Sequence, residues 1–493
     1  MGQKGGPADL SATPAAFAPS ATALPLSAMT PPAMTSPAPD RWGERLPRRL
    51  GLASAVAGLV GTTIGSGIFR TPAVVADRVG MTELFIAGWV LGGVLALAGA
   101  LTYAELAAIF PRTGGIYVYI REAFGRAPAF LFGWAELWVI RPAALGAIAI
   151  VSAEYLWRLL GVDGGAAFAG LPLSLAQATA AMFIVIVGAV NYRGIHLAAM
   201  VQNVSTVLKV AALLALVALG FGLSPSFELT RAVTPSATTL STLTGFGLAL
   251  VSILWAYDGW ADLSFVAGEV KDPQRNMPRA LFLGTAGIIV IYLSVNAVYL
   301  KLIPLERMHG SPLIAADAAQ LIMGAAGVAF VSAAVMVSAF GSLNGSMMVG
   351  PRIFYAMAED RLFFQRLAEV HPRFATPYAS IVLAAILGII YVSVREFAEL
   401  ADQFIIGIWP FYALGVAATF VLRKKRADLD RPYRAWGYPV VPVLFLLAAL
   451  FILGNYMISE PLLFFADVGV ILTGIPVYLW WERRNARPDA GVT

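Results

Sequence analysis

Two long apolar segments of this chain are each interrupted near the middle, and these interruptions constrain the fold more than any other feature. The first segment covers residues 51–80 and is broken at 65–67, while the second covers 250–270 and is broken at 257–259. In hydrocarbon an unpaired backbone N–H or C=O is costly, so non-helical backbone persists only where it lines a cavity or binds something. Two such breaks predict a binding site between two membrane-embedded repeats.

The composition predicts an integral membrane protein surrounded by the lipid bilayer. Hydrophobic residues make up 59% of the chain and charged residues 13%, and the mean hydropathy is +0.75. No soluble domain needs this much apolar surface, whereas a chain of 493 residues with about 12 helical spans does. The apolar runs place these spans at 51–79, 83–111, 128–157, 174–192, 196–220, 242–269, 278–303, 324–356, 376–394, 398–422, 438–458 and 461–481.

The charges predict the orientation in the cell (inner or plasma) membrane. Most of the 34 Lys and Arg residues fall in segments on the same side as the N-terminus, which places both termini in the cytoplasm. The first and sixth spans then run in opposite directions, as an inverted repeat requires, and this arrangement is typical of secondary transporters. The predicted parts are a disordered tail (1–49), a first repeat (50–220), a second repeat (242–423), two further spans (435–482) and a C-terminal tail (483–493).

The first break has the chemistry of an anion site. Gly65 and Gly67 let the chain leave helical geometry, and Pro72 lies where a new half-helix is expected to begin. That half-helix would offer free N–H groups and a positive dipole end to a carboxylate, while the carbonyls that end the preceding half-helix suit an ammonium group. Close helix packing would be the favoured explanation of a lone Gly-Ser-Gly, but the second break favours a site for a zwitterion such as an α-amino acid.

Several segments resemble one transporter family. GTTIGSGIF at 61–69 resembles the unwound first helix of the amino acid–polyamine–organocation (APC) superfamily, and residues 255–281 resemble its L-type amino acid transporter branch, as do 103–125 and 340–361. The resemblance covers the chain from residue 50 onward. It implies an all-α LeuT-type fold, in which a five-plus-five inverted repeat with unwound helices 1 and 6 is followed by two extra helices. It also implies amino acid transport, commonly by exchange.

The resemblance assigns roles to both breaks. The amides of Ser66 and Gly67 would hold the substrate carboxylate, the carbonyls of Ile64, Trp255 and Asp258 would hold its amine, and the Trp255 ring would close over it. The remaining positions of the predicted substrate-binding set are Gly65, Ala256, Tyr257 and Gly259.

Asp258 departs from the family pattern, because many members have a small residue there. Its carboxylate could favour cationic substrates if it faces the site. Alternatively it could cap the following half-helix, which is the favoured interpretation because a carboxylate suits a helix N-terminus.

Lys209 is a lone charge about 13 residues, or roughly 20 Å, into its predicted span. It could pair with backbone carbonyls for a purely structural reason. The family resemblance favours a second interpretation, in which its ammonium replaces a sodium ion beside the first break and makes transport sodium-independent. Buried amines lose their proton more easily, so proton coupling is a further alternative.

Other intramembrane side chains give weaker signals. Arg141 needs a function or a partner that the sequence does not identify. Asn344 could reach the site, although a helix–helix hydrogen bond is favoured. Trp409 is either packing at a kink or a pocket wall, and Phe69 is more consistent with packing than with ligand contact. The charge cluster at 269–279 is either an exposed loop or a gate on the cytoplasmic side.

The sequence also argues against other classes. There is no Cys, no His pair with metal-ligand spacing, no nucleophile elbow and no phosphate-binding loop, so we expect no enzyme activity, no metal and no cofactor. A channel would not need two occluding breaks, and the net charge of +5 reflects the loops rather than nucleic-acid binding. Eukaryotic members of the L-type branch bind a heavy chain through a Cys between spans 3 and 4. Its absence here predicts a bacterial protein without a disulfide-linked partner, and a partner bound without a covalent link stays an open alternative. The oligomeric state is left open.

These features together predict a sodium-independent secondary transporter that exchanges L-amino acids by alternating access. The restricted pocket beside Trp255 favours neutral substrates of small to medium size. A proton-coupled amino acid symporter and a permease for cationic amino acids or polyamines are the alternatives.

Overall fold

The computed structural model of the chain describes residues 2, 44, 46–170, 172–222, 239–308, 311 and 314–485. The predicted tails at 1–49 and 483–493 fall almost entirely outside these residues and stay predictions. In the part that is described, all regular structure is helical apart from two isolated bridges, Leu50 with Val270 and Ala167 with Ser174.

Every predicted apolar range contains a helix. The main elements are α1 Leu52–Thr63, α2 Gly67–Val79, α3 Thr82–Ile109, α4 Ile116–Phe124, α5 Arg126–Ala135, η2 Glu136–Ile140, α6 Arg141–Leu159, α7 Leu175–Tyr192, α8 Ile195–Gly222, α9 Thr239–Tyr257, η3 Asp262–Glu269, α10 Pro273–Leu302, α12 Ile314–Val349, α13 Pro351–Glu359, α14 Tyr378–Val394, α15 Phe397–Lys425, α16 Val440–Ser459, α17 Pro461–Leu472 and α18 Gly474–Asn485. A short α11 covers Leu305–Met308, and η4 covers Gln365–Ala368.

Length and hydropathy qualify nine helices of the described ranges as membrane spans, or ten when the bent pair α1–α2 counts as one span. The apolar helix α14 is shorter, and α9 is separated from the 3-10 helix η3 by the turn at 258–261. The protein is therefore an all-helical, multi-span membrane protein, and the count of about 12 spans stays a prediction.

The first break lies where the sequence predicts it. Ile64, Gly65 and Ser66 are non-helical between α1 and α2, whose axes differ by 41°. The prediction that the second half-helix begins at Pro72 is wrong, because α2 begins at Gly67 and Pro72 lies inside it. A proline in the second turn removes only one hydrogen bond, and glycine allows α2 to begin in contact with α9.

The second break follows Tyr257, where α9 gives way to a turn and then to η3. Gly259 has φ +107°, and a Cβ atom there would lie 2.8–2.9 Å from atoms of Thr63. A Cβ atom on Gly67 would lie 2.6 Å from the Ala256 Cα atom. Each break therefore packs a glycine against the backbone of the other, which holds the two non-helical segments side by side.

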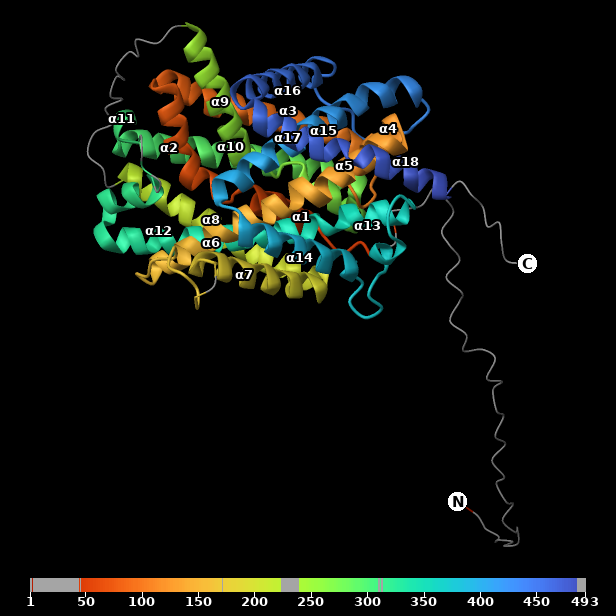
Figure 1. Cartoon of the computed structure of the whole chain (residues 1–493), viewed down its shortest axis with the longest axis horizontal. Helices are drawn as coiled ribbons and strands as arrows, with labels where there is room; N and C mark the ends of the chain where they lie inside the picture. The colour runs from red at the N-terminus through yellow and green to blue at the C-terminus, as the bar shows by residue number, and fades with distance from the viewer. Residues whose placement is uncertain are drawn as a thin grey trace. The chain divides into compact units, whose positions relative to one another are not determined.

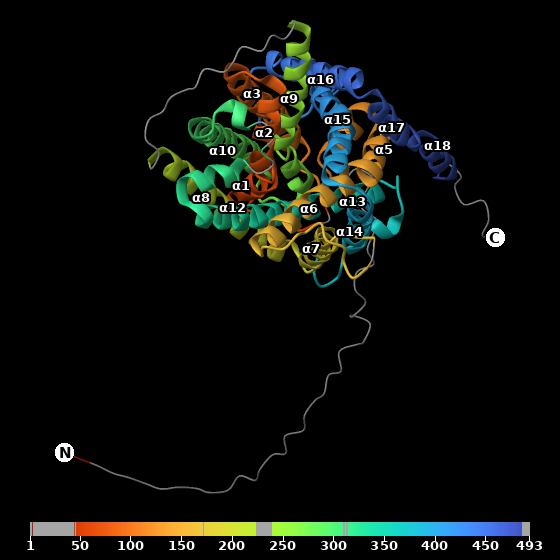
Figure 2. The same ribbon diagram turned by 60° about the vertical axis from the view of Figure 1, so that its left-hand side comes forward.

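The surrounding helices fix this pair of breaks in the middle of the bundle. α1 packs against α8, α10 and α12, and α2 packs against α9. In Figures 1 and 2, α16 lies on one flank of the bundle and α7 on the opposite flank, with α1 and α6 between them. Side chains from several helices can therefore converge on the breaks.

Candidate functional site

A small cavity of about 50 Å³ lies between the two breaks. This volume is far below the roughly 300–1,000 Å³ of a typical small-molecule pocket. The walls come from both breaks and from α6, α12 and α15. The members of the predicted substrate-binding set that line it are Gly65, Ser66, Gly67, Trp255, Asp258 and Gly259.

The other three members of that set, Ile64, Ala256 and Tyr257, are buried and are not among the residues that line the cavity. The Tyr257 hydroxyl donates to the Trp89 carbonyl at 3.2 Å. The Ala256 carbonyl accepts from the Tyr292 hydroxyl at 3.0 Å. The last turn of α9 therefore directs Trp255 toward the cavity and the next two side chains toward α2, α3 and α10.

The start of α2 presents unused hydrogen-bond donors to the cavity. Among the backbone hydrogen bonds of the described residues, none is donated by the amides of Ser66 or Gly67. Both residues line the cavity and are buried, so neither amide is solvated as an exposed helix terminus would be. Free amides combined with the positive end of the helix dipole suit an anion such as a carboxylate.

Lys209 reaches the first break from α8. Its side chain is 1% exposed, and its Nζ atom donates to the carbonyls of Ile64 at 2.6 Å, Ser338 at 2.8 Å and Gly61 at 2.9 Å. It also contacts the Ser342 hydroxyl at 3.0 Å, which itself lies 3.0 Å from the Ile64 carbonyl oxygen. This shell of oxygen atoms around one positive charge resembles the coordination of a small cation. It also leaves the Ile64 carbonyl without spare acceptor capacity for a substrate amine.

Asp258 lines the cavity and accepts a hydrogen bond from the Tyr412 hydroxyl at 2.6 Å. The favoured interpretation of this residue as a helix cap is wrong, because η3 begins after Ala261 with no side-chain cap. The turn at 258–261 separates the carboxylate from the start of η3. A second carboxylate, Asp262, also lines the cavity.

Arg141 lines the opposite wall and has an acidic partner. Its Nε atom lies 3.1 Å from a Glu136 carboxylate oxygen, and its Nη1 atom donates to the Ser346 hydroxyl at 2.9 Å. Both charged side chains are almost fully buried. Residues five apart share a face in the π-helical turn η2, which aligns Glu136 with Arg141.

The remaining candidates are placed away from the cavity wall. Asn344 donates to the Ala198 carbonyl at 3.0 Å and to Gln202 at 3.1 Å, and so joins α12 to α8. The Trp409 ring stacks on Phe445, which favours packing over a role as pocket wall. Phe69 is buried and does not line the cavity.

A larger cavity of about 720 Å³ lies farther along α6, at the end of the bundle that carries Arg158 and Arg395. Ala144 and Ile148 of α6 line the small cavity, whereas Ile150 and Glu154 line the large one. α6 therefore forms a shared wall between the two cavities.

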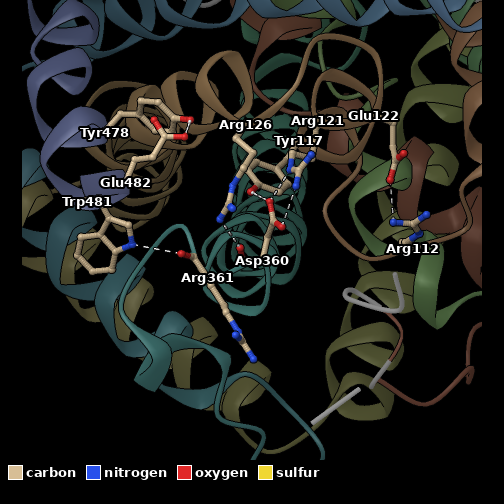
Figure 3. A network of polar contacts seen from close by, with 10 residues as sticks. All are labelled: Arg112, Tyr117, Arg121, Glu122, Arg126, Asp360, Arg361, Tyr478, Trp481 and Glu482. Atoms are coloured by element: carbon tan, nitrogen blue, oxygen red, sulfur yellow. Dashed lines mark hydrogen bonds and ion pairs between the residues drawn. The ribbon is translucent and has the colours of Figure 1, made fainter. Parts of the chain in front are cut away.

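Ion pairs join the helices at the opposite end. Buried Glu269 pairs with Arg352, and buried Glu105 accepts from Arg423 at 2.5 and 2.9 Å. Figure 3 shows a third group, in which Asp360 accepts from Arg121 at 2.7 Å and from Tyr117 at 2.9 Å. The predicted charge cluster at 269–279 is thus divided, since its first member is buried in an ion pair.

The exposed members of that cluster are Lys271, Asp272, Arg275 and Arg279.

Sequence reasoning missed several polar residues of the site, among them Thr62 and Thr63 at the end of α1. Asp262 follows Asp258 by four residues, a spacing that could have indicated a shared face. Glu136 precedes Arg141 by five residues, and no sequence pattern predicts the π-helical turn that aligns them. The serines of α12, Ser342 and Ser346, repeat at a helical spacing that could have indicated one polar stripe toward the cavity. No group of three or more His, Asp or Glu side chains that could hold a metal occurs in the part of the chain described.

Comparisons with known proteins all place the chain among amino acid transporters. A family model described as "Amino acid permease" matches residues 50–479. The serine/threonine exchanger SteT of Bacillus subtilis (strain 168) is 31% identical over 90% of this chain and 98% of its own length. The b(0,+)-type amino acid transporter 1 of Homo sapiens is 30% identical over 90% of this chain and 91% of its own. The human large neutral amino acids transporter small subunit 2 is 29% identical over 90% and 82%, respectively.

The first two of these relatives, an amino acid exchanger and an amino acid transporter, match this chain over more than 90% of their own lengths. The chain is therefore a transporter and not an enzyme. The chain therefore belongs to the amino acid permease family of the APC superfamily and is a multi-span amino acid transporter.

Proposed function

We propose that the protein exchanges neutral L-amino acids of small to medium size across the cell membrane, independently of sodium and by alternating access. The observation that carries this proposal is the cavity between the two breaks. Its wall combines the free amides of Ser66 and Gly67 with the carboxylate of Asp258. A zwitterion that bridges these groups satisfies both at once, because the amides attract its carboxylate and the acid attracts its amine.

The small volume of the cavity supports a small substrate. About 50 Å³ holds no large side chain unless the wall moves. The Trp255 ring packs edge-on against Phe404, with ring centroids 5.1 Å apart, and both side chains line the cavity. These two rings form the movable gate in our proposal, and the serine/threonine exchanger among the relatives is consistent with a small substrate.

The surroundings of Lys209 support the proposed sodium independence. A sodium ion at the first break would need several oxygen ligands, and the ammonium group already occupies such a shell. Like charges repel strongly in a low-dielectric interior, so a bound sodium ion beside this ammonium would be unfavourable.

The proposed architecture is a LeuT-type inverted repeat of about 12 spans with both termini in the cytoplasm. The large cavity at the end carrying Arg158, combined with ion pairs that close the opposite end, supports an outward-facing conformation. Inward opening would then require those ion pairs to separate.

Cationic amino acids are the second candidate, on a specific observation. Asp258 and Asp262 both line the cavity, while the guanidinium of Arg141 is already paired with Glu136. The wall therefore offers two carboxylates with which a positively charged substrate side chain could pair.

Uptake of a radiolabelled amino acid panel into proteoliposomes tests these proposals. We expect saturable uptake of serine-sized neutral amino acids only when the vesicles contain an amino acid, with equal rates in sodium and choline buffers. Liposomes without protein give the background. Uptake of lysine or arginine above all neutral amino acids would select the second candidate, and uptake into empty vesicles driven by a pH gradient would replace exchange with proton symport.

A further inference from the structure

A groove of about 710 Å³ lies at the end of the bundle that carries the Glu269–Arg352 and Glu105–Arg423 pairs. One wall is the first three turns of α10, and the other is the loop 432–436 that precedes α16. The floor includes Leu101 of α3, one turn before Glu105. The Ala435 amide donates to Glu105 at 2.6 Å and so fixes the loop against α3.

Three arginines line this groove and lack an acidic partner. Arg275 and Arg279 are four residues apart on one face of α10, and Arg434 faces them from the loop. All three are exposed, and none forms an ion pair or a side-chain hydrogen bond with the residues that the structure describes. The nearest buried acid, Glu105, is already saturated by Arg423, Arg431 and the Ala435 amide. The groove therefore concentrates positive charge that calls for an anion.

The rest of the groove is apolar and extends toward the membrane interior. Phe282 follows Arg275 by seven residues, about 10 Å along the helix axis, and is 47% exposed. Trp436 is 75% exposed at the rim, as aromatic residues at a membrane–water interface commonly are. A soluble anion would contact only the basic part of the groove. A lipid would occupy both parts, with its headgroup at the arginines and its acyl chain along the apolar side chains.

We propose that this groove is a binding site for an anionic phospholipid. The three guanidinium groups hold the headgroup phosphate, and an acyl chain runs along Phe282 toward Leu101. Occupation would neutralise the arginines and join α10 to the loop before α16. The proposal depends on the membrane location of the protein and is independent of the substrate it carries.

Native mass spectrometry of the purified full-length protein tests this site directly. The protein in neutral detergent is titrated with phosphatidylglycerol or with phosphatidylcholine of the same chain length. We expect one tight phosphatidylglycerol adduct, and the variant R275Q/R279Q/R434Q should weaken it about ten-fold or more because each arginine contributes to headgroup binding. The matched control R366Q/R373Q/K424Q removes three exposed charges from outside the groove and should leave that adduct unchanged.

Two further measurements make the result decisive. The groove variant should keep the thermal stability of the wild type in lipid-free detergent, because the replaced side chains hold no internal partner. Glycerol phosphate at millimolar concentration should not displace the lipid, since it lacks the chain. Equal loss of the adduct in both variants, equal binding of the two lipids, or displacement by glycerol phosphate would each overturn the proposal.

Discussion

The Lys209 ammonium and the Ile64 carbonyl oxygen lie 2.6 Å apart, which joins the middle of α8 to the non-helical end of α1. Its Nζ atom also donates to the carbonyls of Gly61 and Ser338, and the hydroxyls of Ser338 and Ser342 contact the same end of α1. Side chains of α8 and α12 together therefore satisfy the α1 carbonyls that the break would otherwise leave unpaired in the membrane. The positive charge of Lys209 also interacts favourably with the negative end of the α1 dipole, which helps the break to persist.

Replacing Lys209 with Met should abolish transport, because a side chain of similar length without charge cannot donate the hydrogen bonds that the Nζ atom gives to these carbonyls. A hydrogen bond from a charged group contributes about 1.5–3 kcal/mol. Uptake by K209M in proteoliposomes should fall to the background of protein-free vesicles. The control K424M alters an exposed lysine at the end of α15 and should transport normally. Normal uptake by K209M would remove Lys209 from the proposed mechanism.

The glycines of the first break should differ sharply in tolerance. A Cβ atom at Gly67 would lie 2.6 Å from the Ala256 backbone, whereas one at Gly65 would make an ordinary contact of 3.4 Å with the Ser342 hydroxyl. G67A should therefore separate the two breaks and reduce exchange about ten-fold or more. G65A adds a methyl group to the wall of the small cavity without a backbone clash, so it should reduce exchange less than G67A. Initial rates of exchange, normalised to the amount of inserted protein, check this prediction. A faster rate for G67A than for G65A would show that the contact between Gly67 and Ala256 can adjust to a methyl group.

Much of this arrangement was predictable from local sequence. Gly65–Gly67 interrupts an apolar run, and only a lined cavity or a ligand justifies such an interruption in hydrocarbon. Lys209 lies too deep in its span to reach water, so a polar partner inside the bundle was required. Both inferences rest on the cost of unsatisfied groups in the membrane, which depends little on the exact packing.

The rest depends on tertiary geometry that no local pattern encodes. Glu136 meets Arg141 only because η2 is a π-helical turn, and the orientation of Asp258 depends on a hydroxyl from Tyr412, more than 150 residues away. Helix capping was a reasonable expectation for Asp258, yet the turn after α9 ends in a 3-10 helix that starts four residues later. Such pairings depend on the local helix type and on residues that are distant in the sequence.

The buried Glu269–Arg352 pair should be essential for stability. Both side chains are at most 2% exposed, and removing one partner leaves an uncompensated buried charge, which costs about 3–5 kcal/mol. R352Q should lower the apparent Tm in detergent by several degrees. The comparison is R426Q, which breaks an exposed pair with Asp428 and should leave the Tm unchanged. Similar Tm values for the two variants would indicate that Glu269 finds another partner.

The Arg121–Asp360 pair should control access from its end of the bundle. Burial lowers the pKa of the Arg121 guanidinium, but the hydrogen bonds and charge of Asp360 outweigh this effect and raise it, so Arg121 keeps its positive charge. The variant D360N weakens the contact between α4 and α13. Since the chain has no Cys, the substitution T62C places a single thiol in the cavity wall.

In vesicles accessible from the end that carries Asp360, we expect a small polar thiol reagent to label T62C/D360N several-fold faster than T62C alone. Adding substrate amino acid should slow the labelling of both. D317N, which removes a carboxylate that contacts Ser311 outside this pair, serves as the control. Equal labelling of T62C with and without D360N would mean that other contacts hold this end closed.

Asp258 should decide between the two candidate substrate classes. Its carboxylate faces the cavity, so D258N keeps a hydrogen-bonding group beside Tyr412 while it removes the charge. If the substrate is a neutral amino acid whose amine meets this carboxylate, D258N should raise the KM for every amino acid by a similar factor, about ten-fold for the loss of one charge-assisted hydrogen bond. If the carboxylate instead binds a cationic side chain, lysine and arginine should lose uptake selectively while serine keeps its KM. D262N provides the matched comparison on the same wall, and unchanged kinetics for every amino acid in D258N would exclude Asp258 from substrate binding altogether.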